Sequence, residues 1–239
     1  MKQKLVLIMT VSIVMALGLY MLNEAIDRGT KSALGLPLTG QIIIIDPGHG
    51  GRDGGAVSRS GVVEKEVALA ISIYLRDLLQ QAGAFVIMTR ETDMELASEE
   101  AHRLGRRKKE DLMNRVKLIN GSQGDLFVSI HLNSISSPNW RGAQTFYNPL
   151  WDESERLARF VQDELIRNLE NTNRHAKKNQ EVYILKASQI PGILVEVGFL
   201  SNPHEAGLLA TADYQKKVAF AIYEGILRYY SDENSLEFP

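Results

Sequence analysis

Four residues with metal-binding or acid–base side chains stand at corresponding places in separate parts of the sequence. His49, His131 and Glu196 each lie at the carboxyl end of an apolar run of strand length. Glu64 lies at the start of the first long amphipathic stretch, after a glycine-rich loop. Parallel strands end at one common edge of a sheet, where ligands bind. We therefore expect these four side chains to converge.

Two imidazoles and one carboxylate, with a fourth position left for water, form the ligand set of catalytic zinc. The chain has no cysteine, so any transition metal must be held by His, Asp or Glu. Each signal is weak alone, because a single histidine after an apolar strand is more often structural and a buried glutamate is commonly paired with arginine. The joint arrangement favours a metal site. The three remaining histidines lie in polar segments and are predicted to be surface residues: His102, His175 and His204.

The loop around His49, DPGHGGRDGG at 46 to 55, is rich in glycine. Glycine adopts positive φ readily, so the loop can lie close to a metal and leave a cleft above His49. Asp46 and Asn133, each near one histidine in the chain, are candidate partners that would fix the tautomer of a ligand. The loop does not match G-x-G-x-x-G, because Asp53 stands where the third glycine belongs. P-loop, H-E-x-x-H and G-x-S-x-G motifs are also missing from the sequence.

From Gln41 onward, apolar runs of strand length alternate with helical stretches. This rhythm predicts an α/β fold with a mainly parallel, twisted six-stranded sheet and helices on both faces. The predicted strands are 42 to 46, 84 to 89, 125 to 131, 142 to 147, 181 to 185 and 192 to 197. The predicted helices, from their three- and four-residue apolar spacing, are 64 to 82, 111 to 120, 153 to 170 and 212 to 229.

One segment, SEEAHRLGRRKKED at 98 to 111, is polar throughout. A solvated surface insertion is one interpretation. The other is a rim for the substrate, because four consecutive basic residues at 106 to 109 can meet an anionic polymer.

The N-terminal apolar stretch bears on where the protein acts. Residues 5 to 22 carry no charge and follow Lys2 and Lys4, which predicts that residues 1 to 22 are a signal peptide or a membrane anchor. Either interpretation places the rest of the chain outside the cytoplasm, with membrane contact only through this segment. We expect a linker at 23 to 40, a catalytic domain at 41 to 231 and a C-terminal tail at 232 to 239. The net charge of −2 argues against a nucleic-acid partner.

Four blocks of the sequence, taken in order, resemble the signature blocks of the zinc-dependent N-acetylmuramoyl-L-alanine amidases of the amidase_3 class. The resemblance runs from about Gln41 to Tyr230 and is greatest to the branch that acts on the spore cortex. The blocks are DPGHGG at 46 to 51, GVVEKEVAL at 61 to 69, SIHLN at 129 to 133 and ILVEVGFLSN at 193 to 202.

The resemblance implies one zinc ion bound by His49, Glu64 and His131, with Glu196 as the catalytic base. Members of the family hydrolyse the amide between the lactyl group of N-acetylmuramic acid and L-alanine of the peptidoglycan stem peptide. In the cortex branch, a muramic acid deacetylase then helps to convert the bared sugar to muramic δ-lactam. The resemblance thus implies spore-cortex peptidoglycan as substrate, the deacetylase as functional partner, a lipoprotein as a candidate activator, and action on the cell-wall side of the membrane, in the forespore intermembrane space.

Two other functions stay open at this point. A catalytically silent peptidoglycan-binding module would be expected to have lost a ligand or the base, whereas all four residues are present. A zinc peptidase acting on another amide cannot be separated from an amidase by fold and metal alone. Among flanking residues, Arg115 can meet a stem-peptide carboxylate or form a structural salt bridge, and Trp140 and Trp151 can stack on sugar or serve packing.

Overall fold

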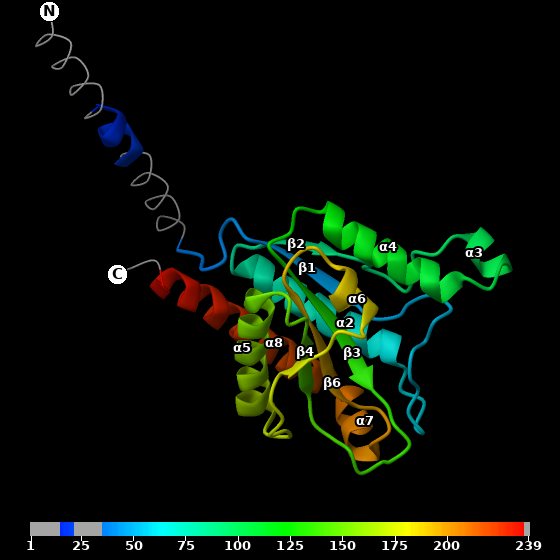
Figure 1. The fold of residues 1–239 in the computed structure, drawn as a ribbon. Helices are drawn as coiled ribbons and strands as arrows, with labels where there is room; N and C mark the ends of the chain where they lie inside the picture. The colour runs from blue at the N-terminus through cyan, green and yellow to red at the C-terminus, as the bar shows by residue number, and fades with distance from the viewer. Residues whose placement is uncertain (1–14, 22–34, 237–239) are drawn as a thin grey trace, which may run out of the picture.

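The computed structural model describes residues 15–21 and 35–236. Six strands form one sheet in the order β2-β1-β3-β6-β4-β5 (Figure 1). Every neighbouring pair is parallel except β4 with β6, which is antiparallel. The predicted mainly parallel six-stranded sheet is therefore confirmed. Its strands are β1 Ile42–Pro47, β2 Phe85–Met88, β3 Leu126–Asn133, β4 Gln144–Tyr147, β5 Lys177–Lys178 and β6 Gly192–Phe199.

The strand predicted at 181 to 185 is wrong. This segment forms the helix α6, Tyr183–Ala187, and the sixth strand is the short edge strand β5. Ile184 and Leu185 are adjacent and both are buried in the same apolar cluster. A helical turn permits this, whereas a strand would point the two side chains to opposite faces. A short apolar run does not distinguish the two cases by periodicity.

The long helices match the predicted ones in place, with differences at their ends. α4 begins at Arg107 rather than 111, and α8 continues to Leu236 rather than 229. α3 and α7 were not predicted, although Asn202 caps α7 by accepting from the backbone N–H groups of His204 and Glu205. The remaining helices are α2 Glu64–Gln81, α3 Glu99–Arg103, α4 Arg107–Gly121, α5 Asp152–Leu169, α7 Pro203–Leu209 and α8 Ala212–Leu236.

The two faces of the sheet carry different helices. On one face, α2, α5 and α8 form the larger apolar cluster together with Ile43 and Ile45 of β1, and α5 and α8 lie side by side (Figure 1). On the other face, α4 and α6 pack against Ile44, Phe127 and Leu194. Side chains alternate between faces along a strand, so the two clusters take alternate residues. Helices on both faces are thus confirmed.

The predictions for residues 1 to 22 and for the linker at 23 to 40 fall mostly outside the described residues. Within the described ranges, no helix is both long enough and apolar enough to cross a bilayer. The signal peptide or anchor therefore stays a prediction.

Candidate metal centre

The alternation of side chains brings polar residues to one half of the face that α4 and α6 cover. Asp46 follows Ile44 by two residues, and Glu196 follows Leu194 by two residues, so each points to the same face as the apolar residue before it. His131 and Glu196 are register partners on the neighbouring strands β3 and β6. The apolar half of this face is covered by α4 and α6, and its polar half lies at the carboxyl ends of the strands.

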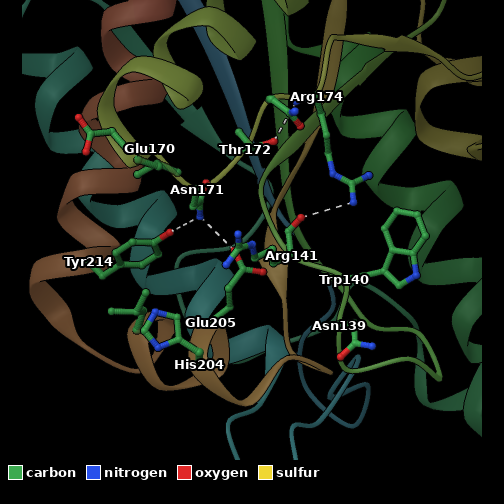
Figure 2. A pocket seen from close by; sticks show the side chains of 13 residues that line it. Asn139, Trp140, Arg141, Glu170, Asn171, Thr172, Arg174, His204, Glu205 and Tyr214 are labelled. Atoms are coloured by element: carbon green, nitrogen blue, oxygen red, sulfur yellow. Dashed lines mark hydrogen bonds between the residues drawn. The ribbon is translucent and has the colours of Figure 1, made fainter.

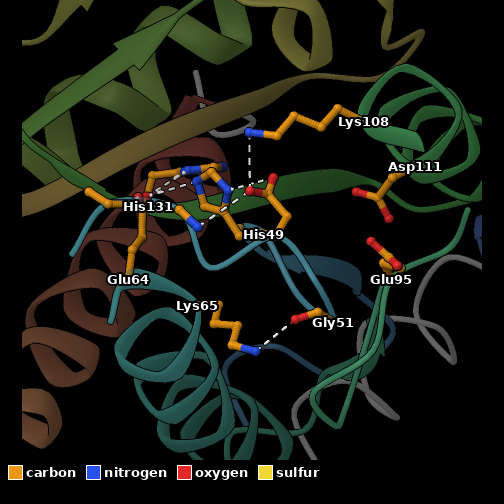
Figure 3. Close-up of polar contacts among 12 residues, drawn as sticks. His49, Gly51, Glu64, Lys65, Glu95, Lys108, Asp111 and His131 are labelled. Atoms are coloured by element: carbon orange, nitrogen blue, oxygen red, sulfur yellow. Dashed lines mark hydrogen bonds and ion pairs between the residues drawn. The ribbon is translucent and has the colours of Figure 1, made fainter. Parts of the chain in front are cut away.

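Glu64 lies between the two histidines (Figure 3). Its Oε1 atom is 3.1 Å from His131 Nδ1 and 3.2 Å from His49 Nε2. One ligand atom from each of the three residues lies within 4.8 Å of the others. The two imidazole rings meet edge to face, with centroids 5.0 Å apart. The structure thus brings two nitrogen donors and one oxygen donor close enough to share one metal ion.

The Glu64 carboxylate is oriented by the backbone. Oε1 accepts the N–H of Leu132 at 2.9 Å, and Oε2 accepts the N–H of Ala56 at 2.8 Å. Burial acts to raise the pKa of Glu64, but hydrogen bonds and charge from His131 and His49 lower it well below its ordinary value. Glu64 is therefore ionised, as a metal ligand must be.

Two glycines explain why the loop around His49 has so little side-chain bulk. A Cβ on Gly48 would lie 2.5 Å from Cε1 of His131. A Cβ on Gly55, where φ is +69°, would lie 2.5 Å from Glu64 Oε2 and 2.7 Å from His49 Cδ2. Such contacts are far inside van der Waals distance, so any side chain here would displace the three candidate ligands.

Glu196 stands apart from this triad. Its Oε2 atom is buried and has no hydrogen-bond partner within the described part of the chain. Burial, with a smaller contribution from the charge of Glu64, raises the pKa of Glu196 to about 7, against the opposing effect of the two histidines. A carboxyl group with this pKa and a free oxygen can take up and release a proton near neutral pH.

The predicted partner of His49 is wrong, and the structure supplies another. The Asp46 oxygens accept hydrogen bonds from Thr89 and Ser129 at 2.6 Å and from Arg115 at 2.8 Å, so they are committed elsewhere. Instead, Asp53 Oδ2 lies 3.0 Å from His49 Nδ1. The signal for Asp53 was its spacing, four residues after His49 in the glycine loop.

Asn133 likewise differs from its predicted role. Its backbone carbonyl accepts the N–H of Leu200, and no hydrogen bond joins its side chain to His131 or His49 among the described residues. The register of β3 against β6 shifts between His131 and Asn133. This irregularity takes Asn133 out of line with the histidine.

Arg115 has the structural role that the sequence left as an alternative. Its side chain is 3 % exposed and ion-pairs with Asp46 and Asp111, each at 2.8 Å. It also donates to the backbone carbonyls of Pro47 and His49. Because all four acceptors belong to the protein, Arg115 holds the glycine loop in place and has a structural role.

The polar segment 98 to 111 contributes Lys108 and Asp111 to the lining of the site. Lys108 Nζ lies 3.2 Å from Asp53 Oδ1, and Lys108 lines a cleft of about 400 Å³ together with His49, His131 and Glu196. His102, predicted as a surface residue, is only 11 % exposed in its side chain because it pairs with Glu95 at 2.6 Å. His175 and His204 are exposed, as predicted.

An open α/β sheet that gathers two imidazoles, a carboxylate between them and a second, uncommitted carboxylate at its carboxyl edge has the layout of a metal-dependent hydrolase. Residues 43–228 match the profile of the N-acetylmuramoyl-L-alanine amidase family Amidase_3. The chain belongs to this family.

Similar proteins agree with this assignment. The germination-specific N-acetylmuramoyl-L-alanine amidase of Bacillus subtilis is 54% identical over 198 residues, which cover 83% of each chain. The CwlD amidase from Clostridioides difficile, solved in complex with the GerS lipoprotein, matches with a TM-score of 0.78 and 42% identity over 80% of this chain and 99% of that one. The amidase AmiC2 of Nostoc punctiforme matches with a TM-score of 0.70 and 32% identity, covering 81% and 99%.

Proposed function

We propose that this protein hydrolyses the amide between the lactyl group of N-acetylmuramic acid and L-alanine of the peptidoglycan stem peptide. The observation that carries the proposal is the convergence of His49, Glu64 and His131 beside the uncommitted carboxyl of Glu196, in a chain of this amidase family. A silent binding module would have no need of two histidines around an ionised Glu64, next to a buried acid with a raised pKa.

The donor set fits one zinc ion. Two nitrogen atoms and one carboxylate oxygen lie within 4.8 Å of one another, and this combination is a standard ligand set for catalytic zinc. Zinc bound by His49, Glu64 and His131 would supply Lewis-acid chemistry: it would lower the pKa of a water molecule to about 7 and polarise the amide carbonyl. Asp53, through its contact with His49 Nδ1, orients that imidazole toward the centre.

Glu196 is the proposed general base. Its free Oε2 accepts a proton from the attacking water, and the same carboxyl then delivers that proton to the departing amine of L-alanine. The pKa near 7 suits both transfers, because the group is then neither a strong acid nor a strong base at neutral pH. Glu64 cannot take this role, since hydrogen bonds from both histidines and two backbone N–H groups keep it ionised and fixed.

We further propose action on spore-cortex peptidoglycan, as a step toward muramic δ-lactam that a muramic acid deacetylase completes. The names of the Bacillus subtilis relative and of the Clostridioides difficile complex support this role and support a lipoprotein as activator. The protein would act on the cell-wall side of the membrane, in the forespore intermembrane space, after export by its N-terminal segment. Muropeptide analysis of spores that lack the protein tests the role, and we expect muramic lactam to disappear.

Digestion of purified peptidoglycan tests the reaction itself. We expect the zinc-loaded protein to release peptides with amino-terminal alanine and to leave glycan strands with bare muramic acid, detected by mass spectrometry. A new amino terminus at any other residue would identify a peptidase instead. Binding to peptidoglycan without cleavage would identify a silent module.

A further inference from the structure

A second hollow lies at the same edge of the sheet, beyond β6 and β4. It has a volume of about 890 Å³ and is bounded by the loop before β4, the end of α5, the segment before β5 and α7 (Figure 2). The proposed reaction uses none of its side chains. Its polar lining includes Trp140, Arg141, Asn171, Arg174 and Tyr214.

Arg174 is held in a fixed orientation in this hollow. Its guanidinium stacks on the rings of Trp140 and Phe199, 5.1 and 5.2 Å from their centroids. Nη1 donates to Gln144 Oε1 at 3.2 Å, and Nη2 lies 3.4 Å from the carbonyl of Arg141. These ring faces and neutral oxygens orient the guanidinium group without forming an ion pair with it.

Neither Arg174 nor Arg141 pairs with a carboxylate within the described ranges. The two acids that line the hollow are committed or turned away. Glu205 is 2 % exposed and accepts from the N–H groups of Gly142 and Phe199 and from the Asn171 amide. The Glu170 side chain points away from both arginines (Figure 2). The charges of Arg141 and Arg174 both act on the buried carboxyl group of Glu205. Two guanidinium groups thus stand against this one carboxyl group in the lining, so the hollow carries an excess of positive charge.

Arg174 in the hollow and Glu196 beside the metal centre are both neighbours of Gln144 of β4. Gln144, which accepts from Arg174, is the register partner of Glu196 on the adjacent strand. Opposed side chains on paired strands lie about 5 Å apart, and one residue of an extended peptide spans about 3.5 Å. A peptide whose first amide lies at Glu196 would therefore bring its second or third residue to Arg174.

We propose that this hollow binds a free carboxylate of the stem peptide, within about two residues of the scissile amide, and that Arg174 pairs with it. This inference rests on the proposed amidase function. It assigns to Arg174 the recognition that the buried Arg115 cannot perform. Guanidinium and carboxylate form charge-assisted, directional hydrogen bonds, and the stacking on Trp140 and Phe199 means that little side-chain freedom is lost when they form.

Two synthetic substrates test the proposal: N-acetylmuramoyl-L-alanyl-D-glutamate with both carboxyl groups free, and the same compound with both amidated. We expect the zinc-loaded wild type to show a lower KM for the free acid. Arg174→Gln should raise KM for the acid by about tenfold to a hundredfold, the range for a hydrogen bond to a charged group. It should leave kcat within about twofold and leave KM for the amidated form unchanged. Arg174→Lys should restore part of the difference, because it retains the charge.

The control is Arg159→Gln on α5, whose side chain is 70% exposed and pairs with Glu155 outside the hollow. It should leave both KM values unchanged. Equal losses on both substrates in Arg174→Gln, or equal KM values for both in the wild type, would overturn the proposal. The wild-type comparison decides even where Arg174→Gln does not fold.

Calorimetric binding of the uncut substrates to the full-length Glu196→Gln variant separates this inference from the proposed function. Preferential binding of the free acid that is lost with Arg174→Gln supports the carboxylate site, even where the wild type cleaves neither compound and the amidase proposal fails. Equal binding of the free-acid and amidated substrates would contradict the carboxylate site, even where both compounds are cleaved.

Discussion

His49 has a backbone conformation that side-chain-bearing residues rarely adopt, with φ at 59°. For a residue with a Cβ, the left-handed region costs about 1 to 2 kcal/mol. Two buried arginines hold the loop in this shape: Arg115 donates to the carbonyls of Pro47 and His49, and Arg90 donates to those of Pro47 and Gly48. The strained backbone directs the imidazole toward Glu64. At the scale of single residues, the site depends on the carbonyl partners of its loop as much as on its ligands.

Substitutions of the proposed ligands and base should separate metal binding from proton transfer. His49→Ala and His131→Ala each remove a donor, so we expect the purified variants to lose most of their zinc by elemental analysis. Glu196→Gln preserves the triad and removes only the group that accepts a proton. It should keep a full equivalent of zinc and lose turnover by about a hundredfold or more. Substantial turnover in Glu196→Gln would show that another group is the base.

Gly48 offers a test of close packing around the metal centre. Its φ lies outside the left-handed region, so Gly48→Ala acts only through the Cβ that would meet the His131 ring at 2.5 Å. We expect zinc affinity, measured by competition with a chromophoric chelator, to fall by about tenfold to a hundredfold. This is the loss typical of mutating a residue that holds a metal ligand in position. Gly207→Ala is the matched control, because a Cβ there meets nothing within 4 Å. Equal affinities in the two variants would contradict the packing argument.

Among the elements, α3 and the start of α4 show how a mostly polar segment becomes ordered. Glu95 accepts from His102 and Arg107, each at 2.6 Å, and is only 10% exposed. The Ser98 hydroxyl caps α3, and the Glu110 carboxylate accepts the N–H of Ser98. These local bonds replace the apolar stripe that most helices use. They also place Lys108 beside Asp53, so this segment contributes to the rim of the cleft.

Glu95→Gln tests whether this ion-pair cluster orders the segment. The change removes the negative charge of the Glu95 carboxylate, which both His102 and Arg107 contact. We therefore expect faster hydrogen exchange of backbone amides across α3 and the first turn of α4. The rest of the fold should exchange as in the wild type. Glu99→Gln is the control, since its carboxylate is 82% exposed and lies 3.9 Å from Arg52. Unchanged exchange in Glu95→Gln would mean that packing alone orders the segment.

At the scale of the whole molecule, one face of the sheet carries both an apolar packing surface and the candidate metal centre. Its apolar half is covered by α4 and α6, and its polar half carries Asp46, His131 and Glu196. The opposite face is buried under α2, α5 and α8. This larger core supplies most of the stability, because burial of apolar surface is the dominant favourable term in folding. It allows the other face to keep a buried, unpaired acid.

Burial of the ionised Glu196 carboxylate should destabilise the zinc-free protein, and this effect should appear in the pH dependence of its free energy of unfolding. The pKa of Glu196 is raised from 4.5 to about 7 in the folded state, so the folded protein favours the protonated form. Stability that is fully present below pH 4.5 is then lost as the pH rises toward 7. Chelator-treated Glu196→Gln should match the wild type near pH 4 and exceed it by up to about 3 kcal/mol at pH 8.

Denaturant unfolding of both proteins at the two pH values measures this difference. The comparison with the wild type cancels the titration of groups that do not interact with Glu196. A constant difference between the two proteins from pH 4 to pH 8 would show that the Glu196 carboxyl is not destabilised by burial.

The sequence by itself determined the class of fold, the places of the long helices, and the four residues His49, Glu64, His131 and Glu196 that the structure brings together. These features depend on local periodicity and on strand ends, which a linear pattern records directly. Strand runs such as 42 to 45 and 192 to 195 pack against helices on both faces of the sheet, so their apolar character is continuous and easily recognised.

Only the tertiary structure decided which polar groups meet. Asp46, near the end of β1, and Asp53, in the loop that follows, are close in the sequence. Yet Asp46 pairs with Arg115, 69 positions away, while Asp53 contacts His49. The helix α6 and the site of Arg174 were also settled by packing across elements far apart in the chain. A hydrogen bond or ion pair needs a partner within about 3 Å and in the right direction, and that distance is set by how the elements pack rather than by any spacing along the sequence.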